Sequence, residues 1–184
     1  MRVFLIFCSV LAFVVSSLGQ SSAPASHSRD WVQQLAERHE AHATDHLRVH
    51  IFRLRPGDDL LESIQTYARA RHIKAAIVLS AVGSLTHASV RFANQPGAAE
   101  RSGHFEIVSL VGTVEQDGEH LHLSISSETG ETIGGHLLPG CKIYTTGEIA
   151  IGELEHAKFT READRQGSGW DELKVFPEKT QRQK

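Results

Sequence analysis

HLHLSISSETGETIGGHLLPGC, residues 120–141, is the segment that is most informative about the fold. Its first half alternates polar and apolar residues, which is typical of a β-strand with one buried face. Its second half can return as the neighbouring antiparallel strand after a short turn near Gly130. His120 and His122 are two residues apart, so on a strand both side chains point to the same face. The segment therefore predicts a β-hairpin that carries imidazoles on one face.

The length of the turn decides whether a third histidine, His136, joins this pair. If the turn has three residues, 128–130, cross-strand partners have numbers that sum to 258, and His122 faces His136. If it has two, His136 faces Leu123 and points away from the pair. A bulge at Gly134-Gly135 would then restore the alignment, because glycine adopts the backbone angles that bulges need. Both registers are open at this point.

Three imidazoles that meet at one point can hold a metal ion. Zinc binds imidazole nitrogens at ~2.0–2.1 Å, and three histidines leave a fourth position for water. Such a water can ionise near neutral pH. The alternative is that the histidines form a polar solvent face, with His136 packed in a subunit interface. No catalytic residue can be named, although Glu106 and Glu148 are candidates for orienting a ring nitrogen.

The first twenty residues have the order of a secretory signal peptide: a charged start, an apolar run over residues 3–15, and small residues over 16–19. The apolar run is shorter than the ~20 residues that span a bilayer. We therefore expect cleavage near residue 20, a secreted, extracellular protein, and no stable membrane insertion after cleavage. Residues 21–45 are expected to form a polar leader and a short amphipathic helix over residues 30–43.

Charge and cysteine content exclude several classes of protein. Removal of Arg2 with the signal leaves 18 basic and 22 acidic residues, a formal net charge of −4. This balance offers no general attraction to a phosphate backbone, so no nucleic-acid partner is expected. Cys141 is the one cysteine of the expected mature chain, which excludes an internal disulfide. Its thiol is buried, paired with another chain, or a soft metal ligand.

Residues 46–155 are expected to form the globular domain. A helix over residues 59–71 is predicted by its apolar spacing and by Asp59 in the N-cap position. Residues 75–82 predict a strand buried on both faces, followed by a turn at Gly83-Ser84. Residues 94–103 predict a loop. The other predicted strands begin at His46 and cover 85–92, 105–114, 120–126, 132–138 and 143–154.

The predicted fold class is therefore α/β, of the α+β type, with a largely antiparallel sheet and a helix packed on one side. Beyond this domain, residues 156–184 are expected to be a charged C-terminal extension that ends in a solvated tail.

Four segments together resemble the plants and prokaryotes conserved domain, or PPC domain. They are RPGDDL at 55–60, AVGSL at 81–85, GHFEIVSLVG at 103–112, and HLHLSIS at 120–126 with the GGHLLPGC and YTTGEIAIGEL runs that follow it. The resemblance covers about 110 of the 184 residues. It implies a PPC-like antiparallel fold that forms a homotrimer. In some prokaryotic members histidines hold a metal, which implies that His120, His122 and His136 bind zinc or another divalent metal here.

Plant members of the family carry an AT-hook, an Arg-Gly-Arg-Pro segment that enters the minor groove of DNA. The corresponding Arg53-Leu54-Arg55-Pro56 has leucine where the narrow groove requires glycine. DNA binding is therefore not carried over, and a DNA-associated regulator is the least favoured function.

The favoured function is a secreted, homotrimeric, metal-binding module for assembly or for binding a small-molecule ligand. The alternative is a zinc-dependent enzyme that acts on a small ligand at the subunit interface. The first is favoured because the sequence shows no recognisable acid–base pair around the metal.

Overall fold

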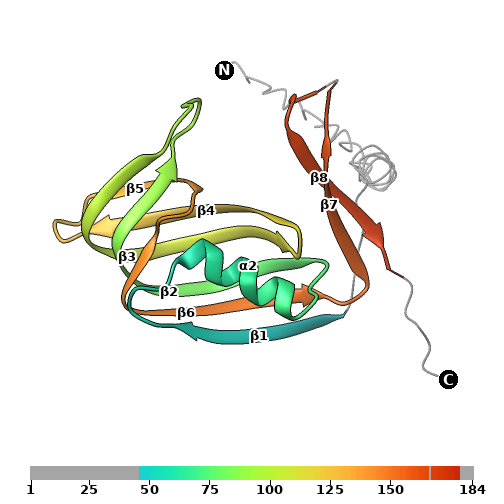
Figure 1. Ribbon diagram of the computed structural model, residues 1–184, viewed down its shortest axis with the longest axis horizontal. Coiled ribbons are helices and arrows are strands. Elements are labelled where there is room, and N and C mark those ends of the chain that lie inside the picture. The colour runs from blue at the N-terminus through green and yellow to red at the C-terminus, as the bar shows by residue number, and fades with distance from the viewer. Residues whose placement is uncertain (1–45, 166, 179–184) are drawn as a thin grey trace, which may run out of the picture.

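The computed structural model describes residues 46–165 and 167–178 (Figure 1). The expected signal peptide, leader, helix over 30–43 and final tail therefore lie outside the described residues. The described elements are β1 (Leu47–Leu54), α2 (Leu60–Ala70), β2 (Ala76–Arg91), β3 (Ala99–Glu115), β4 (Gly118–Ser127), β5 (Thr132–Leu137), β6 (Lys142–Leu154), β7 (Ala157–Ala163) and β8 (Asp171–Pro177).

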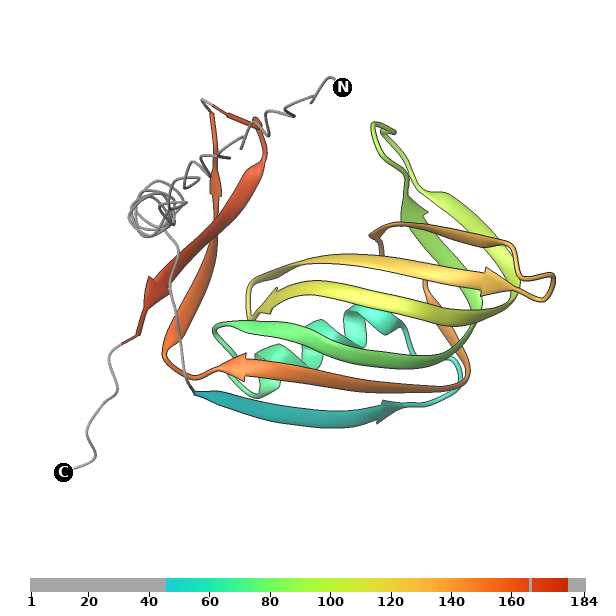
Figure 2. The same cartoon turned by 180° about the vertical axis from the view of Figure 1, so that it is seen from behind.

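Six of these strands form one antiparallel sheet in the order β1-β6-β2-β3-β4-β5. The end of β2 also pairs with β5, so β2, β3, β4 and β5 curl around one another at that end of the sheet. Helix α2 lies across one face of the sheet, as Figure 1 shows, and Figure 2 shows the opposite face from behind. The predicted architecture, a mostly antiparallel sheet with a helix on one side, is confirmed.

Helix α2 begins where the sequence predicts it. Asp59 is the N-cap, and its carboxylate accepts a hydrogen bond from the Glu62 N–H at 3.1 Å. The same carboxylate accepts from the Gly140 N–H at 2.7 Å, which ties the start of the helix to the loop before β6. The helix buries one face against the sheet. Its buried residues are Leu60, Leu61, Ile64 and Ala68, and they share a core with Leu121, Leu123, Ile125, Ile149 and Ile151.

The predicted turn at Gly83-Ser84 is wrong, because β2 runs without interruption through these residues. Gly83 has a φ of +147°, a conformation that other residues rarely adopt. A Cβ atom on Gly83 would lie 2.1 Å from the carbonyl oxygen of Thr146 on β6. The glycine therefore lets two strands approach closely where their register shifts, and it does not reverse the chain.

The predicted loop over residues 94–103 is also too long. Strand β3 already begins at Ala99 and pairs with Val90 on β2. The sequence from 97 to 103 is rich in glycine and alanine, so its propensity for strands is low. Pairing with the extended end of β2 overrides that propensity.

The sheet face opposite α2 is apolar and exposed in the single chain. The prediction that residues 75–82 are buried on both faces is wrong for this chain, because Leu79 and Val82 are 45% and 54% exposed. On edge strand β1, Phe52 packs against Tyr67 of α2, whereas Ile51 points the other way and is 77% exposed. We call this surface the outer apolar face. It consists of Leu47, Val49, Ile51, Leu79, Val82, Val108 and Val111.

The C-terminal extension forms a β-hairpin, β7–β8, where the sequence predicts only a charged extension. Its base is fixed to the segment just before β2, because the Phe159 N–H donates to the Lys74 carbonyl oxygen at 3.0 Å. Ala157 and Phe159 pack with Ala75 in a small second apolar cluster. None of the helices in the described residues is both long and apolar enough to cross a membrane.

Candidate metal centre

The β4–β5 hairpin adopts the three-residue register. The Ser127 N–H donates to the Glu131 carbonyl oxygen at 2.9 Å, which closes a turn over residues 128–130. Gly130 ends this turn with a φ of +82°, as expected for a three-residue hairpin loop. His122 therefore pairs directly with His136, and no bulge at Gly134-Gly135 is needed. The two-residue alternative is wrong.

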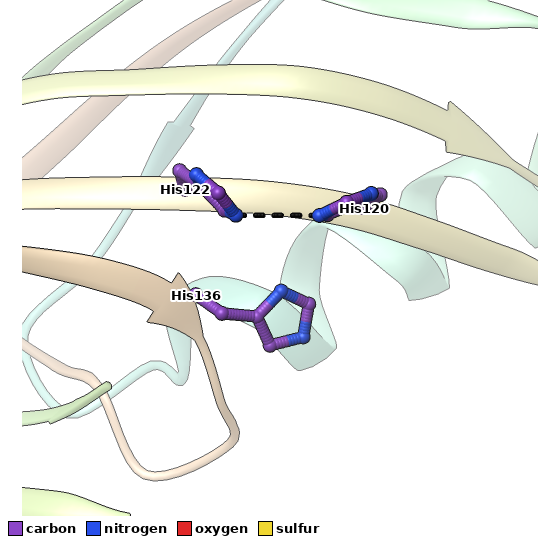
Figure 3. A group of neighbouring side chains, drawn as sticks. All are labelled: His120, His122 and His136. Atoms are coloured by element: carbon purple, nitrogen blue, oxygen red, sulfur yellow. Dashed lines mark hydrogen bonds between the residues drawn. The ribbon is translucent and has the colours of Figure 1, made fainter. Parts of the chain in front are cut away.

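The three imidazoles converge on one point on the sheet face opposite the core (Figure 3). Leu121 and Leu123 are buried in the core, so the histidines between and beside them project to the other face. One ring nitrogen from each histidine lies within 4.8 Å of the other two. The Nε2 atoms of His120 and His122 are 3.2 Å apart. Two nitrogens on one tetrahedral zinc at ~2.0–2.1 Å would be roughly 3.3–3.4 Å apart, so the pair already has a fitting separation.

His136 supplies the observation that tests whether the residues fit a metal. Its Nδ1 is buried and has no hydrogen-bond partner among the described residues. In Figure 3 this nitrogen points toward the gap between His120 and His122. A buried ring nitrogen without a partner is costly, and a metal ion at the convergence point would satisfy it. The donor set of three imidazoles therefore fits a metal that favours nitrogen ligands.

The electrostatics of the site favour neutral imidazoles at His120 and His136. Burial lowers the pKa of His120, and the nearby positive charges of His122 and Arg161 lower it further, while Glu172 acts in the opposite direction. Burial also lowers the pKa of His136, and Arg91 contributes to the same shift. A neutral imidazole is the form that binds a metal, so the site is prepared for binding near neutral pH.

His120 and His136 border a cavity of about 560 Å³ between the sheet and the β7–β8 hairpin. Arg161 of β7 holds the hairpin beside His120: its Nε donates to Glu115 Oε1 at 2.9 Å, and its guanidinium also donates to the Thr113 hydroxyl at 2.5 Å. Thr113 is the cross-strand partner of His120. The cavity is lined by Arg91, Asn94, Glu119, His120, His136, Arg161, Trp170, Asp171 and Glu172.

Glu106 and Glu148, the candidates for orienting a histidine ring, are not at the site. Glu106 pairs with Ser126, four residues along β4 from His122, and Glu148 lies on β6 opposite Val82. Neither lines the cavity. The residues that do, Glu172 and Arg91 among them, were missed because they come from other strands. Arg91 could have been suspected from its place at the end of a predicted strand, but Glu172 lies in the hairpin that was not predicted.

Cys141 is not part of the histidine group. Its side chain is fully buried, and its sulfur accepts a hydrogen bond from the Ser89 N–H at 3.2 Å. Burial raises the pKa of the Cys141 thiol to about 11. Of the three alternatives considered for this cysteine, burial is therefore the one that the structure supports.

Comparison with known proteins agrees with this fold. The model of the Plants and Prokaryotes Conserved (PCC) domain matches residues 41–155. The chain belongs to this family, whose domain is also written PPC. The match ends at the start of the β7–β8 hairpin, so Trp170 and Glu172 lie beyond the part of the chain that defines the PPC domain.

Relatives of this PPC protein include proteins of very different length. A bifunctional protein GlmU from Synechococcus is 43% identical over 131 residues, which is 71% of this chain and 21% of that protein. The chain thus spans about a fifth of the length of that relative. A solved hypothetical protein from Salmonella cholerae-suis is 38% identical, has a TM-score of 0.72, and matches over 74% of this chain and 97% of its own. A metal-containing protein from Archaeoglobus fulgidus has the same fold, with 24% identity and a TM-score of 0.62 over 72% of this chain and 96% of its own.

Proposed function

We propose that this PPC protein is an exported, trimeric module that binds a divalent metal through His120, His122 and His136 and presents it to a small ligand. The observation that carries the proposal is the buried Nδ1 of His136, which has no hydrogen-bond partner within residues 46–165 and 167–178 and points between two converging imidazoles. The Archaeoglobus protein supports it, since a protein with this fold is metal-containing.

Zinc is the metal that fits the donor atoms best. Three imidazole nitrogens suit zinc and its late transition-metal neighbours, whereas calcium and magnesium prefer oxygen ligands. When bound, such an ion would supply a Lewis acid with a position open to water or ligand. The chain itself would favour the neutral form of the His120 and His136 imidazoles by lowering their pKa, and would fix the spacing of the group through the β4–β5 register.

Assembly into a trimer is supported by the outer apolar face. Monomeric proteins rarely expose large contiguous apolar surfaces, and larger ones mark interaction sites. Three of the exposed residues, Leu47, Val49 and Ile51, lie on edge strand β1, where unpaired backbone groups also invite association. Copies of the chain would bury this face against one another and place the histidine sites near subunit boundaries.

Metal analysis of the purified protein tests the metal site. We expect one zinc per chain in the wild type and in His87→Ala. His87 is an exposed histidine on β2, outside the histidine group, and its Nδ1 lies 3.0 Å from the Thr86 hydroxyl oxygen. We expect His122→Ala to lose the metal, since removal of one of three ligands typically abolishes stable binding. Equal metal content in the wild type and His122→Ala would overturn the proposal.

Solution mass tests the assembly. We expect a trimer at micromolar concentration. Ile51→Asp should dissociate it, because burying an unpaired carboxylate in an apolar interface costs on the order of several kcal/mol in desolvation. An exposed substitution away from the outer apolar face, Glu162→Gln, serves as the control. A wild type that stays monomeric would contradict the trimer.

A zinc-dependent enzyme is the second candidate, and Glu172 is the observation that favours it. This half-buried carboxylate borders the cavity beside His120, where it could accept a proton from a reacting group. If the protein is a hydrolase, the zinc-loaded chain should cleave 4-nitrophenyl acetate faster than the metal-free chain, and Glu172→Gln should lower that rate by about 100-fold. Equal rates with and without zinc would remove this candidate. DNA regulation is not proposed.

A further inference from the structure

Arg91 lies directly opposite His136 in the pairing of β2 with β5. Because His136 in turn lies opposite His122, three neighbouring strands present His122, His136 and Arg91 as one row on the same face. Directly paired residues in an antiparallel sheet have Cβ atoms about 4.5 to 5.5 Å apart. The Arg91 side chain therefore leaves the sheet on the same face as the histidine group, and Arg91 and His136 line the same cavity.

Arg91 and Arg161 are the two arginines that line the cavity, and they differ in their partners. Arg161 is held by Glu115 and Thr113, whereas Arg91 makes no ion pair with any residue that the structure describes. The Arg91 side chain is half-buried, so neighbouring residues restrict its motion. A planar guanidinium offers donors in a fixed fork that matches the two oxygens of a carboxylate.

Trp170 gives the cavity an aromatic wall. The Arg91 guanidinium carbon lies 5.9 Å from the centre of the Trp170 ring system. Trp170 is 70% exposed, although large aromatic side chains are normally covered. It belongs to the β7–β8 hairpin, beyond the residues that match the PPC domain. The extension therefore adds a planar apolar surface next to the cation and the histidines.

The rim of the cavity limits the charge of what it can hold. Glu119, Asp171 and Glu172 all line it. These carboxylates repel a dianion such as phosphate more strongly than a monoanion. The volume of about 560 Å³ lies within the range of sites for small organic molecules.

We propose that the cavity binds a small planar monocarboxylate. Its carboxylate is held by Arg91 with an oxygen directed to the histidine-bound metal, and its ring or conjugated body lies against Trp170. This inference rests on the proposed metal site and adds the ligand class, a residue that recognises the anion, and a role for the C-terminal hairpin. Arg91 and Trp170 are binding residues in this arrangement, and no bond is made or broken.

Calorimetric titration of the zinc-loaded full chain with benzoate tests the proposal. We expect Arg91→Gln to weaken benzoate binding by roughly 10–100-fold, the loss of a charge-assisted bidentate hydrogen bond. Arg101→Gln, an exposed arginine on β3 whose side chain contacts the Glu100 carbonyl oxygen, should bind as the wild type does. Trp170→Leu should weaken benzoate by roughly three- to tenfold and leave acetate unchanged.

Zinc content measured on the same samples separates the two possible failures. If the wild type holds no zinc, the proposed function fails and this inference fails with it. If the wild type and Arg91→Gln both hold zinc but bind benzoate equally, or if neither binds it, only the ligand assignment is overturned. Tighter binding of inorganic phosphate than of benzoate would also overturn it, since the acidic rim would then not select a monoanion.

Discussion

Gly135 and Arg91 meet through their backbones: a Cβ atom on Gly135 would lie 2.5 Å from the Arg91 carbonyl oxygen. The neighbouring Gly134 also lies close to β4: a Cβ atom on it would be 2.9 Å from the Leu123 carbonyl oxygen. The glycine pair thus lets β5 pass between β4 and β2. This close passage is what sets His136 between His122 and Arg91.

Gly135→Ala should therefore disturb the site without touching a histidine. The added methyl group must push β5 away from β2, and overpacking of this kind typically costs about 1–3 kcal/mol of unfolding free energy. Urea denaturation and metal titration should show lower stability and weaker metal binding together. Gly97→Ala, where a Cβ meets nothing within 4 Å, should change neither. If Gly135→Ala is as stable as the wild type, the close approach of β5 to β2 does not require a glycine at this position.

The ion pair between Arg161 and Glu115 should be the main interaction that holds the β7–β8 hairpin beside the histidine site. Glu115 is 4% exposed, and its second oxygen, Oε2, has no partner among the described residues. Arg161→Met would leave that carboxylate buried without its cation, at a cost of about 3 kcal/mol in unfolding free energy.

A double-mutant cycle checks this assignment. Removal of both partners, in Arg161→Met with Glu115→Met, should recover most of the stability, because no charge then remains buried. The exposed Arg165→Met on the same hairpin should stay within about 0.5 kcal/mol of the wild type. If Arg161→Met behaves like Arg165→Met, the ion pair does not anchor the hairpin.

Cys141 should give the protein an alkaline stability limit. The folded state raises the pKa of its thiol from the ordinary value of 9.0 to about 11. Below pH 9 the thiol is protonated in both states. Between pH 9 and 11 the unfolded chain releases a proton that the folded chain keeps, so unfolding becomes easier as pH rises, by up to roughly 2–3 kcal/mol.

The comparison of the wild type with Cys141→Ala isolates this contribution. The unfolding free energy of the variant should fall less steeply between pH 9 and 11, since lysines and tyrosines titrate equally in both proteins. Ellman's reagent should react with the wild type only after denaturation, because the thiol is fully buried. Rapid reaction of the native protein would contradict this burial.

The parts of the fold that follow local rules could be predicted from the sequence. Asp59 marks the start of α2 because its short carboxylate caps the first turn. The His122–His136 pair is one of the two registers that strand alternation allows, and the three-residue turn ending in Gly130 is the one that the chain adopts. Both depend on residues within about fifteen positions of one another.

The parts that depend on distant contacts could not be predicted in this way. Gly83 looks like a turn residue, but its conformation is set by the approach of Thr146 on a strand sixty residues later in the chain. The β7–β8 hairpin was missed because it has few apolar residues. Ala157 and Phe159 of β7 pack in a small cluster that is separate from the main core. A search for alternation at 157–159 and 173–175 would have found it.

X-ray absorption at the zinc edge, on the zinc-loaded full chain, tests the central claim most directly. The account predicts a four-coordinate ion with three imidazole nitrogens and one further light atom, all at about 2.0–2.1 Å, and the loss of imidazole scattering in His136→Gln. A sulfur at about 2.3 Å, or a spectrum that His136→Gln leaves unchanged, would show that the metal is held elsewhere and would contradict the account.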